Sequence, residues 1–378
     1  MSEWKKCPIG EVVTLRQGFA INAKSKHYMS KEETSLPLLR IADMKNGTKE
    51  VFVKEEIPQR FIAHPEDIIY TRTGNVGLVF RNNYGVMHNN CFSVTPNDAD
   101  ELSRDFLYYA LQNKTFFDTA NALARGAAQP DLPHTSFNSI EFAYPSLFVQ
   151  ERIATILSRY DSLIENYQKQ IKLLEEAAQR LYKEWFIDLR FPGHENTKIV
   201  DGVPEGWTPS QLGQLVEFKR GKTITKKDVI DGDIPVVAGG LEPAYYCNKS
   251  NTAERVITVS GSGANAGFTR MYFEKVWASD CSFVDVSVTP FLHFIYCYLK
   301  DNKTTIDNMQ KGAAQPHVYA KDINSMELCI PIESVIKSFE RTASKYFDTI
   351  SSLQYQLRLL TEARDRLLPK LMSGEITV

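Results

Sequence analysis

The chain has 378 residues, of which 43% are apolar and 24% are charged, and its formal net charge is −2. This length suits two or three domains with buried cores, and no uninterrupted apolar run approaches the roughly 18 residues that a membrane-spanning helix needs. Acidic and basic residues stay balanced along the sequence, so no segment shows the basic excess that is usual for a protein that binds nucleic acid alone.

The start of the chain, MSEWKKCPIGEV, lacks the pattern of a secretory signal, because Pro and Glu rather than an apolar stretch follow its charges. Six cysteines are scattered without a CxxC pair or a spacing typical of a metal site. We therefore expect a cytoplasmic protein with reduced thiols and no metal. The cysteines are Cys7, Cys91, Cys247, Cys281, Cys297 and Cys329.

Residues 1–145 are predicted to form a first globular domain. Short β-rich runs such as DIIYTRTGNVGLVF precede helical patterns that end near residue 125. Residues 207–331 show the same mixture, with ERVITVSGSGANAGFTRMYF as their β-rich part. Both regions predict an α/β or α+β fold with a curved, mostly antiparallel sheet. Residues 192–206, rich in Pro, Gly and charge, are the expected linker.

The hexapeptide RGAAQP at Arg125–Pro130 returns as KGAAQP at Lys311–Pro316. The offset of 186 residues between Gly126 and Gly312 then holds without a gap for about sixty residues, which indicates an internal duplication. Earlier segments correspond more loosely, since IGEVVTLRQG matches LGQLVEFKRG at an offset of 203. We interpret each half as a divergent globular part followed by an element of fixed length.

That element is a long helix, predicted at residues 146–191 and again at 332–372, with a tail at 373–378. Apolar residues recur at steps of three and four over more than four heptads, which is typical of a coiled-coil seam. A helix of roughly 36 residues would be about 54 Å long and would need a partner helix. Equivalent halves predict antiparallel pairing about a pseudo-two-fold axis. Arg364 is the one charged residue at a seam position. The predicted seam consists of Ile153, Leu157, Tyr160, Ile164, Tyr167, Ile171, Leu174, Leu181, Phe339, Tyr346, Ile350, Leu353, Leu357, Leu360 and Leu367.

Turn chemistry favours a structural role for the hexapeptide. Gly126 and Gly312 are expected to end a helix in a left-handed turn, with the following Ala-Ala-Gln-Pro in extended form. This interpretation is preferred to a direct ligand contact by Gln129 or Gln315.

Several motifs of catalytic or cofactor chemistry fail in their context. The run GSGANAG at 261–267 precedes a strand-like segment, so a tight strand connection is favoured over a dinucleotide cradle. Gly221-Lys222-Thr223 lacks the upstream Gly of a P-loop, since that position is Val216. His88 and Cys91 have no second pair to complete a metal site. We predict no catalytic residue and no metal site in this chain.

Polar loops with basic residues are the candidates for DNA contact, because Arg, Lys, Asn and Thr can reach phosphates and base edges. An ordinary solvated surface is the alternative, and the near-neutral charge favours it on composition alone. The candidates are Arg16, Lys24, Lys26, Arg40, Arg72, Thr73, Asn75, Arg81, Lys219, Arg220, Lys222, Lys226 and Lys227.

The whole chain resembles the specificity subunit of type I restriction-modification systems. The resemblance is carried by the paired GAAQP elements, the helix entry VQERIATIL, the FPGHE linker into GVPEGW and the closing RLLPKLMSGEI. One departure is the second helix entry, SVIKSFERTAS, where contacts are expected to differ between the halves.

The resemblance implies two target-recognition domains that bind a bipartite double-stranded DNA target, and helices that space them and dock modification subunits. It implies no cofactor in this chain. S-adenosylmethionine belongs to two adenine-methylating modification subunits, and ATP and magnesium to motor-nuclease subunits of the full complex. Two alternatives stay open: a subunit of a related or modification-only system, and a coiled-coil scaffold that joins proteins.

Overall fold

The computed structural model describes residues 4–311 and 316–378, and it divides into two compact units. The first unit comprises Met1–Glu165 and Arg358–Val378, and the second comprises Asn166–Leu357. Each unit therefore contains one globular part and one segment of each of two long helices.

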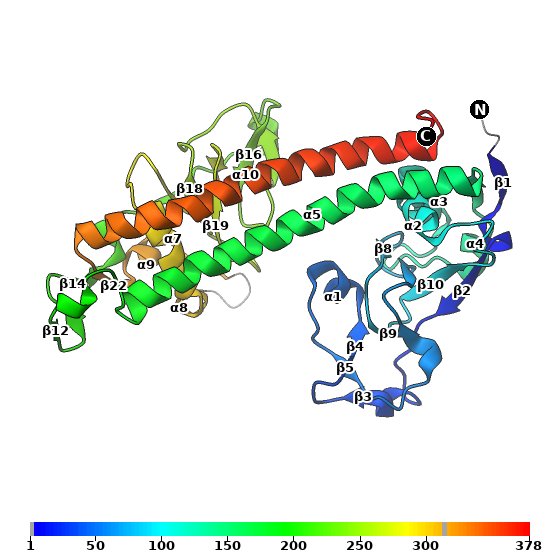
Figure 1. Ribbon diagram of the computed structural model, residues 1–378, viewed down its shortest axis with the longest axis horizontal. Coiled ribbons are helices and arrows are strands. Elements are labelled where there is room, and N and C mark those ends of the chain that lie inside the picture. The colour runs from blue at the N-terminus through cyan, green and yellow to red at the C-terminus, as the bar shows by residue number, and fades with distance from the viewer. Residues whose placement is uncertain (1–3, 312–315) are drawn as a thin grey trace. The chain divides into compact units, whose positions relative to one another are not determined.

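The first globular part is built on two small sheets. One is antiparallel with the order β2-β10-β7-β8, and the other has the order β3-β5-β4-β9-β6 with a single parallel pair, β4 and β9. Figure 1 shows α2 and α3 beside the N-terminal part of α5. The strands are β1 (Lys5–Pro8), β2 (Val13–Gln17), β3 (Met29–Ser30), β4 (Leu36–Leu39), β5 (Phe52–Val53), β6 (Ile62–Ala63), β7 (Ile68–Thr71), β8 (Val79–Phe80), β9 (Gly85–Met87), β10 (Cys91–Pro96) and β11 (Glu141–Tyr144), and the helices are α1 (Ile41–Asn46), α2 (Arg104–Gln112), α3 (Lys114–Leu123) and α4 (His134–Asn138).

The second globular part repeats the order of the four-stranded sheet and of three of the five strands in the other sheet. Its antiparallel sheet runs β15-β21-β18-β19, its smaller sheet runs β17-β16-β20, and β16 and β20 form its parallel pair. The strands are β12 (Ile199–Val200), β13 (Val203–Pro204), β14 (Thr208–Gln211), β15 (Lys219–Arg220), β16 (Ile234–Val237), β17 (Tyr245–Cys247), β18 (Val256–Ser260), β19 (Thr269–Tyr272), β20 (Trp277–Ala278), β21 (Cys281–Asp285) and β22 (Glu327–Ile330), and the helices are α6 (Leu212–Leu215), α7 (Leu292–Asp301), α8 (Lys303–Asn308) and α9 (Ala320–Asn324).

The common strand order confirms the predicted mixed fold and the duplication. The loop GSGANAG joins β18 to β19, which pair antiparallel, so it is the tight strand connection that was expected. The linker is not entirely irregular, because β12 and β13 form a hairpin within it.

Two equivalent glycines show how closely the halves correspond. Gly18 follows β2 and Gly221 follows β15, and a Cβ atom on either would overlap a backbone carbonyl oxygen, that of His88 or that of Ser279. Only glycine allows this approach of two chain segments. The loosely matched segments IGEVVTLRQG and LGQLVEFKRG therefore occupy the same place in the two folds.

The long helices are α5 (Leu147–Tyr182), which continues as a π-helical turn at Lys183–Ile187, and α10 (Glu333–Met372). Pro369 lies inside the last turn of α10, and the helix continues for three residues beyond it. No helix in the described parts of the chain is long and apolar enough to cross a membrane.

Late residues of one helix pack on early residues of the other, so the helix segments run antiparallel in each unit. In the second unit, the rings of Trp185 and Phe186 lie 5.8 and 5.1 Å from that of Phe339. In the first unit, Leu157 and Leu371 are fully buried in one core. All the predicted seam residues are buried or half-buried, and some of them, such as Ile153 and Phe339, lie in the cores of the globular parts.

All six cysteines are free, as the scattered spacing predicted. Cys91 and Cys281 begin the equivalent strands β10 and β21. Burial raises the pKa of each thiol to about 12, so both stay protonated and inert near neutral pH.

Candidate nucleic-acid interface

Most predicted arginines of the first globular part are held by carboxylates. Arg16 Nη2 donates to Asp67 at 2.6 Å, and its Nη1 donates to two backbone carbonyl oxygens. Arg40 pairs with Asp43 at 2.6 Å and with Glu50. The hydrogen bond between Arg40 and Asp43 raises the pKa of the guanidinium and lowers the pKa of the carboxyl group. These guanidinium groups hold the fold together, and a DNA contact by either would share or replace these bonds.

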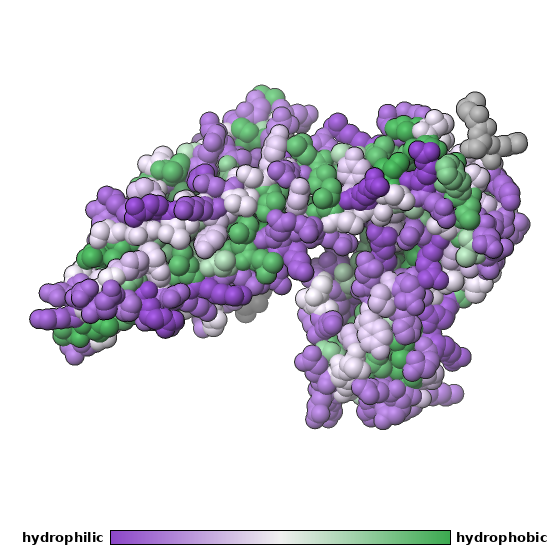
Figure 2. Space-filling view, viewed as in Figure 1, coloured by the Kyte–Doolittle hydropathy of each residue, from purple (hydrophilic) through white to green (hydrophobic). Residues whose placement is uncertain are grey.

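Lys24 and Lys26 differ from these arginines because both are exposed and neither has an ion pair among the described residues. They lie in the loop that follows β2 and enters a short 3-10 helix at Lys26–Tyr28. Asn75 is also exposed, at the tip between β7 and β8. In Figure 2 the lobe that carries β3, β4 and β5 is largely hydrophilic on the face shown.

The second globular part offers a similar surface in the equivalent segment. Lys219, Lys222, Lys226 and Lys227 are exposed, and no ion pair holds them within the described chain. Arg220 is paired with Asp280 at 3.3 Å, and 57% of its side chain remains exposed. In each half, then, exposed lysines follow the equivalent edge strand, β2 or β15, of the antiparallel sheet.

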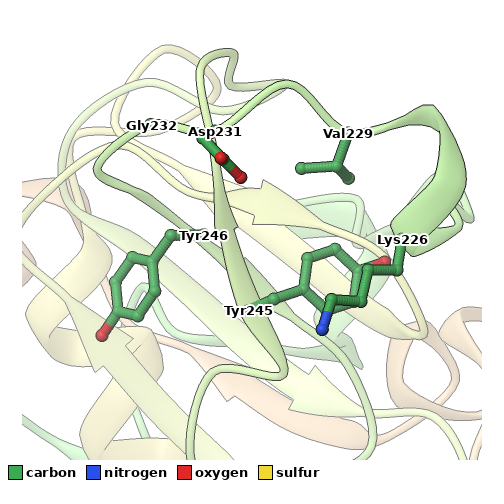
Figure 3. Close-up of a pocket in the computed structure, with 6 residues that line it drawn as sticks. All are labelled: Lys226, Val229, Asp231, Gly232, Tyr245 and Tyr246. Atoms are coloured by element: carbon green, nitrogen blue, oxygen red, sulfur yellow. The ribbon is translucent and has the colours of Figure 1, made fainter.

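A pocket of about 290 Å³ is lined by one of these lysines, Lys226, as Figure 3 shows. Tyr245 and Tyr246 are neighbours on β17, so their rings point to different sides of the strand. The Tyr245 hydroxyl donates to the Ile224 carbonyl at 2.6 Å, which fixes that ring beside Lys226. The pocket brings a cation, a carboxylate and two tyrosines together. Its lining residues are Lys226, Val229, Asp231, Gly232, Tyr245 and Tyr246.

The hexapeptide loop corrects one expectation. Gly126 does have a left-handed backbone, with φ of 98°, but α3 has already ended at Leu123. The backbone groups of Arg125 and Asp131 exchange two hydrogen bonds of 2.8 Å, which closes the intervening residues into a loop. Ala127–Gln129 therefore bend back instead of leaving in extended form. Gly312 and Gln315, the corresponding residues of the second copy, lie outside the described residues.

This hexapeptide loop, Arg125–Asp131, is fastened to the glycine-containing turn after β7. Gly74 N donates to the Pro130 carbonyl at 2.8 Å, and Thr73 Oγ1 donates to Asp131 at 2.6 Å. Arg72 Nη2 also donates to Asp131 at 2.6 Å. The structure thus brings the predicted residues Arg72 and Thr73 together on Asp131, which the sequence did not identify because the second copy has His317 at that place.

The second half keeps the backbone bonds that border this segment, with other side chains beside them. Gly263 N donates to the Pro316 carbonyl at 3.0 Å, and the backbone groups of Lys311 and His317 exchange hydrogen bonds of 2.9 and 3.0 Å. Here Ser262 is held by Asp280. The backbone arrangement is common to both halves, whereas the side chains that fasten it differ.

Arg81 and Arg364 meet at the junction between the first globular part and the helices. Asp161 of α5 binds Arg364 of α10 at 3.0 Å and Arg81 at 3.2 Å, and it accepts the Tyr109 hydroxyl at 2.6 Å. The Arg81 guanidinium also lies 4.1 Å from the Tyr108 ring centre. The ion pair with Asp161 therefore explains why a charged residue, Arg364, occupies a seam position. Arg81 belongs to the same junction and does not lie on an open surface.

The second half fills the same junction with apolar groups. At the 186-residue offset, Phe347 replaces Asp161 and Ala178 replaces Arg364. Strand β8 pairs with β7 as β19 pairs with the equivalent strand β18. In this alignment Met271 is the residue equivalent to Arg81. All three are buried, and the His293 ring stacks on Phe347 at 4.6 Å. The two junctions are therefore not interchangeable.

The helix entries also differ, as the departure in sequence predicted. Gln150 of the VQER entry is fully buried, and its amide oxygen accepts the Ser103 backbone N–H at the start of α2 at 2.8 Å. Its Nε2 donates to the carbonyls of Glu101 and Pro145, each at 2.9 Å.

At the same place in the second helix, Ile336 is buried and apolar. Glu340, one turn later, takes over the start of α7. It accepts the Phe294 backbone N–H at 2.8 Å and lies 2.6 Å from His293 Nδ1. Each helix thus anchors its own globular part by a different polar side chain.

Replacing Asp161 by Ala is expected to lower the free energy of unfolding by about 3 kcal/mol, because two half-buried arginines and a tyrosine lose their acceptor. The matched control is Asp105→Ala, since Asp105 lies 3.8 Å from the same Arg81 but is 73% exposed, and its loss should cost less than about 0.5 kcal/mol. Urea unfolding of the full chain measures both. Equal shifts for the two variants would contradict the junction described above.

Two like globular parts, each anchored on segments of two antiparallel helices, define an internally duplicated protein with two equivalent domains. The chain belongs to the family of type I restriction modification DNA specificity domains, whose model matches residues 1–176 and again residues 204–357. This confirms the resemblance in the motifs, and the two globular parts are its target-recognition domains.

Curated relatives agree with this assignment. The chain is 28% identical over 311 residues to the type I restriction enzyme MjaIX specificity subunit of Methanocaldococcus jannaschii, covering 76% of this chain and 72% of that protein. It is 22% identical to the HindI specificity subunit of Haemophilus influenzae, with both chains covered completely. The crystal structure of a type I restriction-modification S subunit from M. genitalium shares the fold, with a TM-score of 0.62, 19% identity and coverage of 98% and 96%.

Proposed function

We propose that each target-recognition domain binds one half of a bipartite DNA target, and that the paired helices set the distance between the half-sites. The observation that carries the proposal is the duplication itself: the order of the four-stranded sheet is kept, while the side chains along the lysine-bearing segments differ between the halves. A common scaffold with unlike surfaces suits a target whose halves have unlike sequences.

The candidate contacts are the lysines that follow the equivalent edge strands, with Asn75 and the pocket beside Lys226. Lysines at loop ends can contact phosphates, and polar side chains beside them can reach base edges. The paired arginines of the first domain act as positioning groups for these loops. Because the chain has no basic excess, the isolated subunit should bind DNA weakly and with strong salt dependence.

The proposal includes partners that supply the chemistry. Two modification subunits would bind S-adenosylmethionine and methylate adenine, and motor-nuclease subunits would use ATP and magnesium in the full complex. Exposed apolar residues on the helices, such as Leu163, Leu173 and Leu359, support a docking role for the outer helix faces. The chain itself would hold no cofactor and act inside the cell, on DNA.

Co-expression of this chain with its modification subunits, followed by genome-wide mapping of methylated adenines, tests the proposal. The expected result is one bipartite motif with two unlike specific parts and an unspecific spacer of fixed length. Absence of methylation together with a stable complex that fails to retain DNA would favour the alternative, a coiled-coil scaffold that joins proteins.

A further inference from the structure

The hexapeptide loop is the part of each recognition domain that the chain repeats almost unchanged. Its two copies differ only at the first residue, where Arg125 is matched by Lys311, so even this position keeps a cation. The side chains that fasten the loop differ between the halves, as do the lysine-bearing segments. An element that stays constant between two domains with unlike targets must face something that both domains meet alike.

The first copy exposes a compact polar surface. Gly126, Ala127, Ala128 and Gln129 are all exposed, and Arg125 is exposed without an ion pair in the described chain. Small side chains at these positions let another molecule approach the loop backbone closely. The surface therefore offers an exposed loop backbone, one amide side chain and one guanidinium.

The turn beside the loop extends this surface. Gly74 and Asn75 are exposed, and a Cβ atom on Gly74 would meet nothing within 4 Å. Because Gly74 N is bound to the Pro130 carbonyl at 2.8 Å, turn and loop form one unit. The second domain keeps that bond, between Gly263 and Pro316. The bond between the turn and the proline that ends the hexapeptide is therefore common to both domains.

We propose that these paired loops contact the DNA sugar-phosphate backbone, at one place in each half-site, without reading bases. The inference rests on the proposed function, since it assumes that both domains bind DNA. The sugar-phosphate backbone is the same in every half-site, whereas base edges are not. Backbone N–H groups and cationic side chains donate hydrogen bonds to phosphate oxygens. Small residues allow a phosphate to come close to the loop backbone. Such contacts would fix the position of each domain on the duplex, while other residues would recognise the base sequence.

The test removes the flanking cation from each copy, in Arg125→Ala, Lys311→Ala and the double variant. Each full chain is assembled with its modification subunits, and its affinity for a target duplex and a scrambled duplex is measured between about 50 and 300 mM salt. Each lost phosphate contact lowers the slope of log affinity against log salt by about 0.9, so the double variant should lose between about 0.9 and 1.8. Affinity for both duplexes should fall by the same factor, and the methylated motif should not change.

The two positions are not expected to respond equally. Lys311 is paired with Asp322 at 2.8 Å, whereas Arg125 has no such partner among the described residues. Arg125→Ala should therefore have the larger effect, and Arg125→Lys should retain the slope. Lys114→Ala is the matched control, because Lys114 lies at the start of α3, the helix that ends shortly before Arg125, and is paired with Asp118. Its slope should equal that of the unaltered protein.

Three outcomes would overturn the proposal. An unchanged slope in the double variant would show that the loops touch no phosphate. Loss of modification subunits from the complex would identify the loops as a protein contact. A changed motif would identify them as base-reading elements. Failure of the proposed function is distinguishable from all three, because the unaltered complex would then show no preference for the target duplex.

Discussion

Replacing the first recognition domain with a second copy of the other one is expected to convert the methylated motif into an inverted repeat of a single half-site. Gly10–Asn138 would be exchanged for Gly213–Asn324, because each glycine packs directly on the asparagine that ends the same segment. The helix segments run antiparallel, so two like domains attached at equivalent positions should face the duplex in opposite directions. The half-site read by the original first domain should disappear completely.

The junction determines whether this chimera folds well. The transplanted domain would meet Asp161 and Arg364 where its own site provides Phe347 and Ala178, and unpaired charges would face an apolar surface. Four further substitutions should restore its stability without altering the motif. They are Gln150→Ile, Ala154→Glu, Asp161→Phe and Arg364→Ala.

Mapping methylated adenines and measuring urea midpoints for both chimeras separates specificity from stability. The unadapted chimera is expected to unfold at lower urea than the adapted one, and both should give the same inverted motif. Modular recognition would be refuted by a motif that keeps both original halves, or by one in which neither half survives.

The sequence was sufficient to predict the elements whose signals are local or repeated. An apolar repeat is visible along one helix, so the two long helices were predicted without knowledge of the fold. The duplication added the pairing of the helices, because equivalent halves imply a symmetric arrangement. The mixed, mostly antiparallel fold followed from strand-length runs between turns.

What the sequence could not predict depends on partners far along the chain. Arg16 binds Asp67, 51 residues away, and Arg81 binds Asp161, 80 residues away. Each looked like an available cation because its carboxylate lies in another element. The hexapeptide was misinterpreted for the same reason, since Thr73 fastens Asp131 from 58 residues away. The remaining candidates for DNA contact stay predictions.

The helices themselves are expected to determine the spacing of the half-sites. Inserting seven residues after Glu165 in α5 and seven after Leu357 in α10, at the boundary of the two units, adds the same length to both. A heptad turns the helix by only about 20° from its starting direction, so the seam persists. The added length is about 10.5 Å, which corresponds to about three base pairs of duplex at 3.4 Å each.

The methylated motif should then keep both half-sites and gain about three unspecific positions between them. One added turn of four residues in α5 alone should also alter the spacing, but it shifts the seam of one helix against the other and should lower stability as well. The paired insertion is therefore the sharper experiment, because it changes length while the contacts between helices are retained. If the spacing stayed the same with both insertions in place, the distance between half-sites would have to be set by the modification subunits, and the helices would serve only to join the domains.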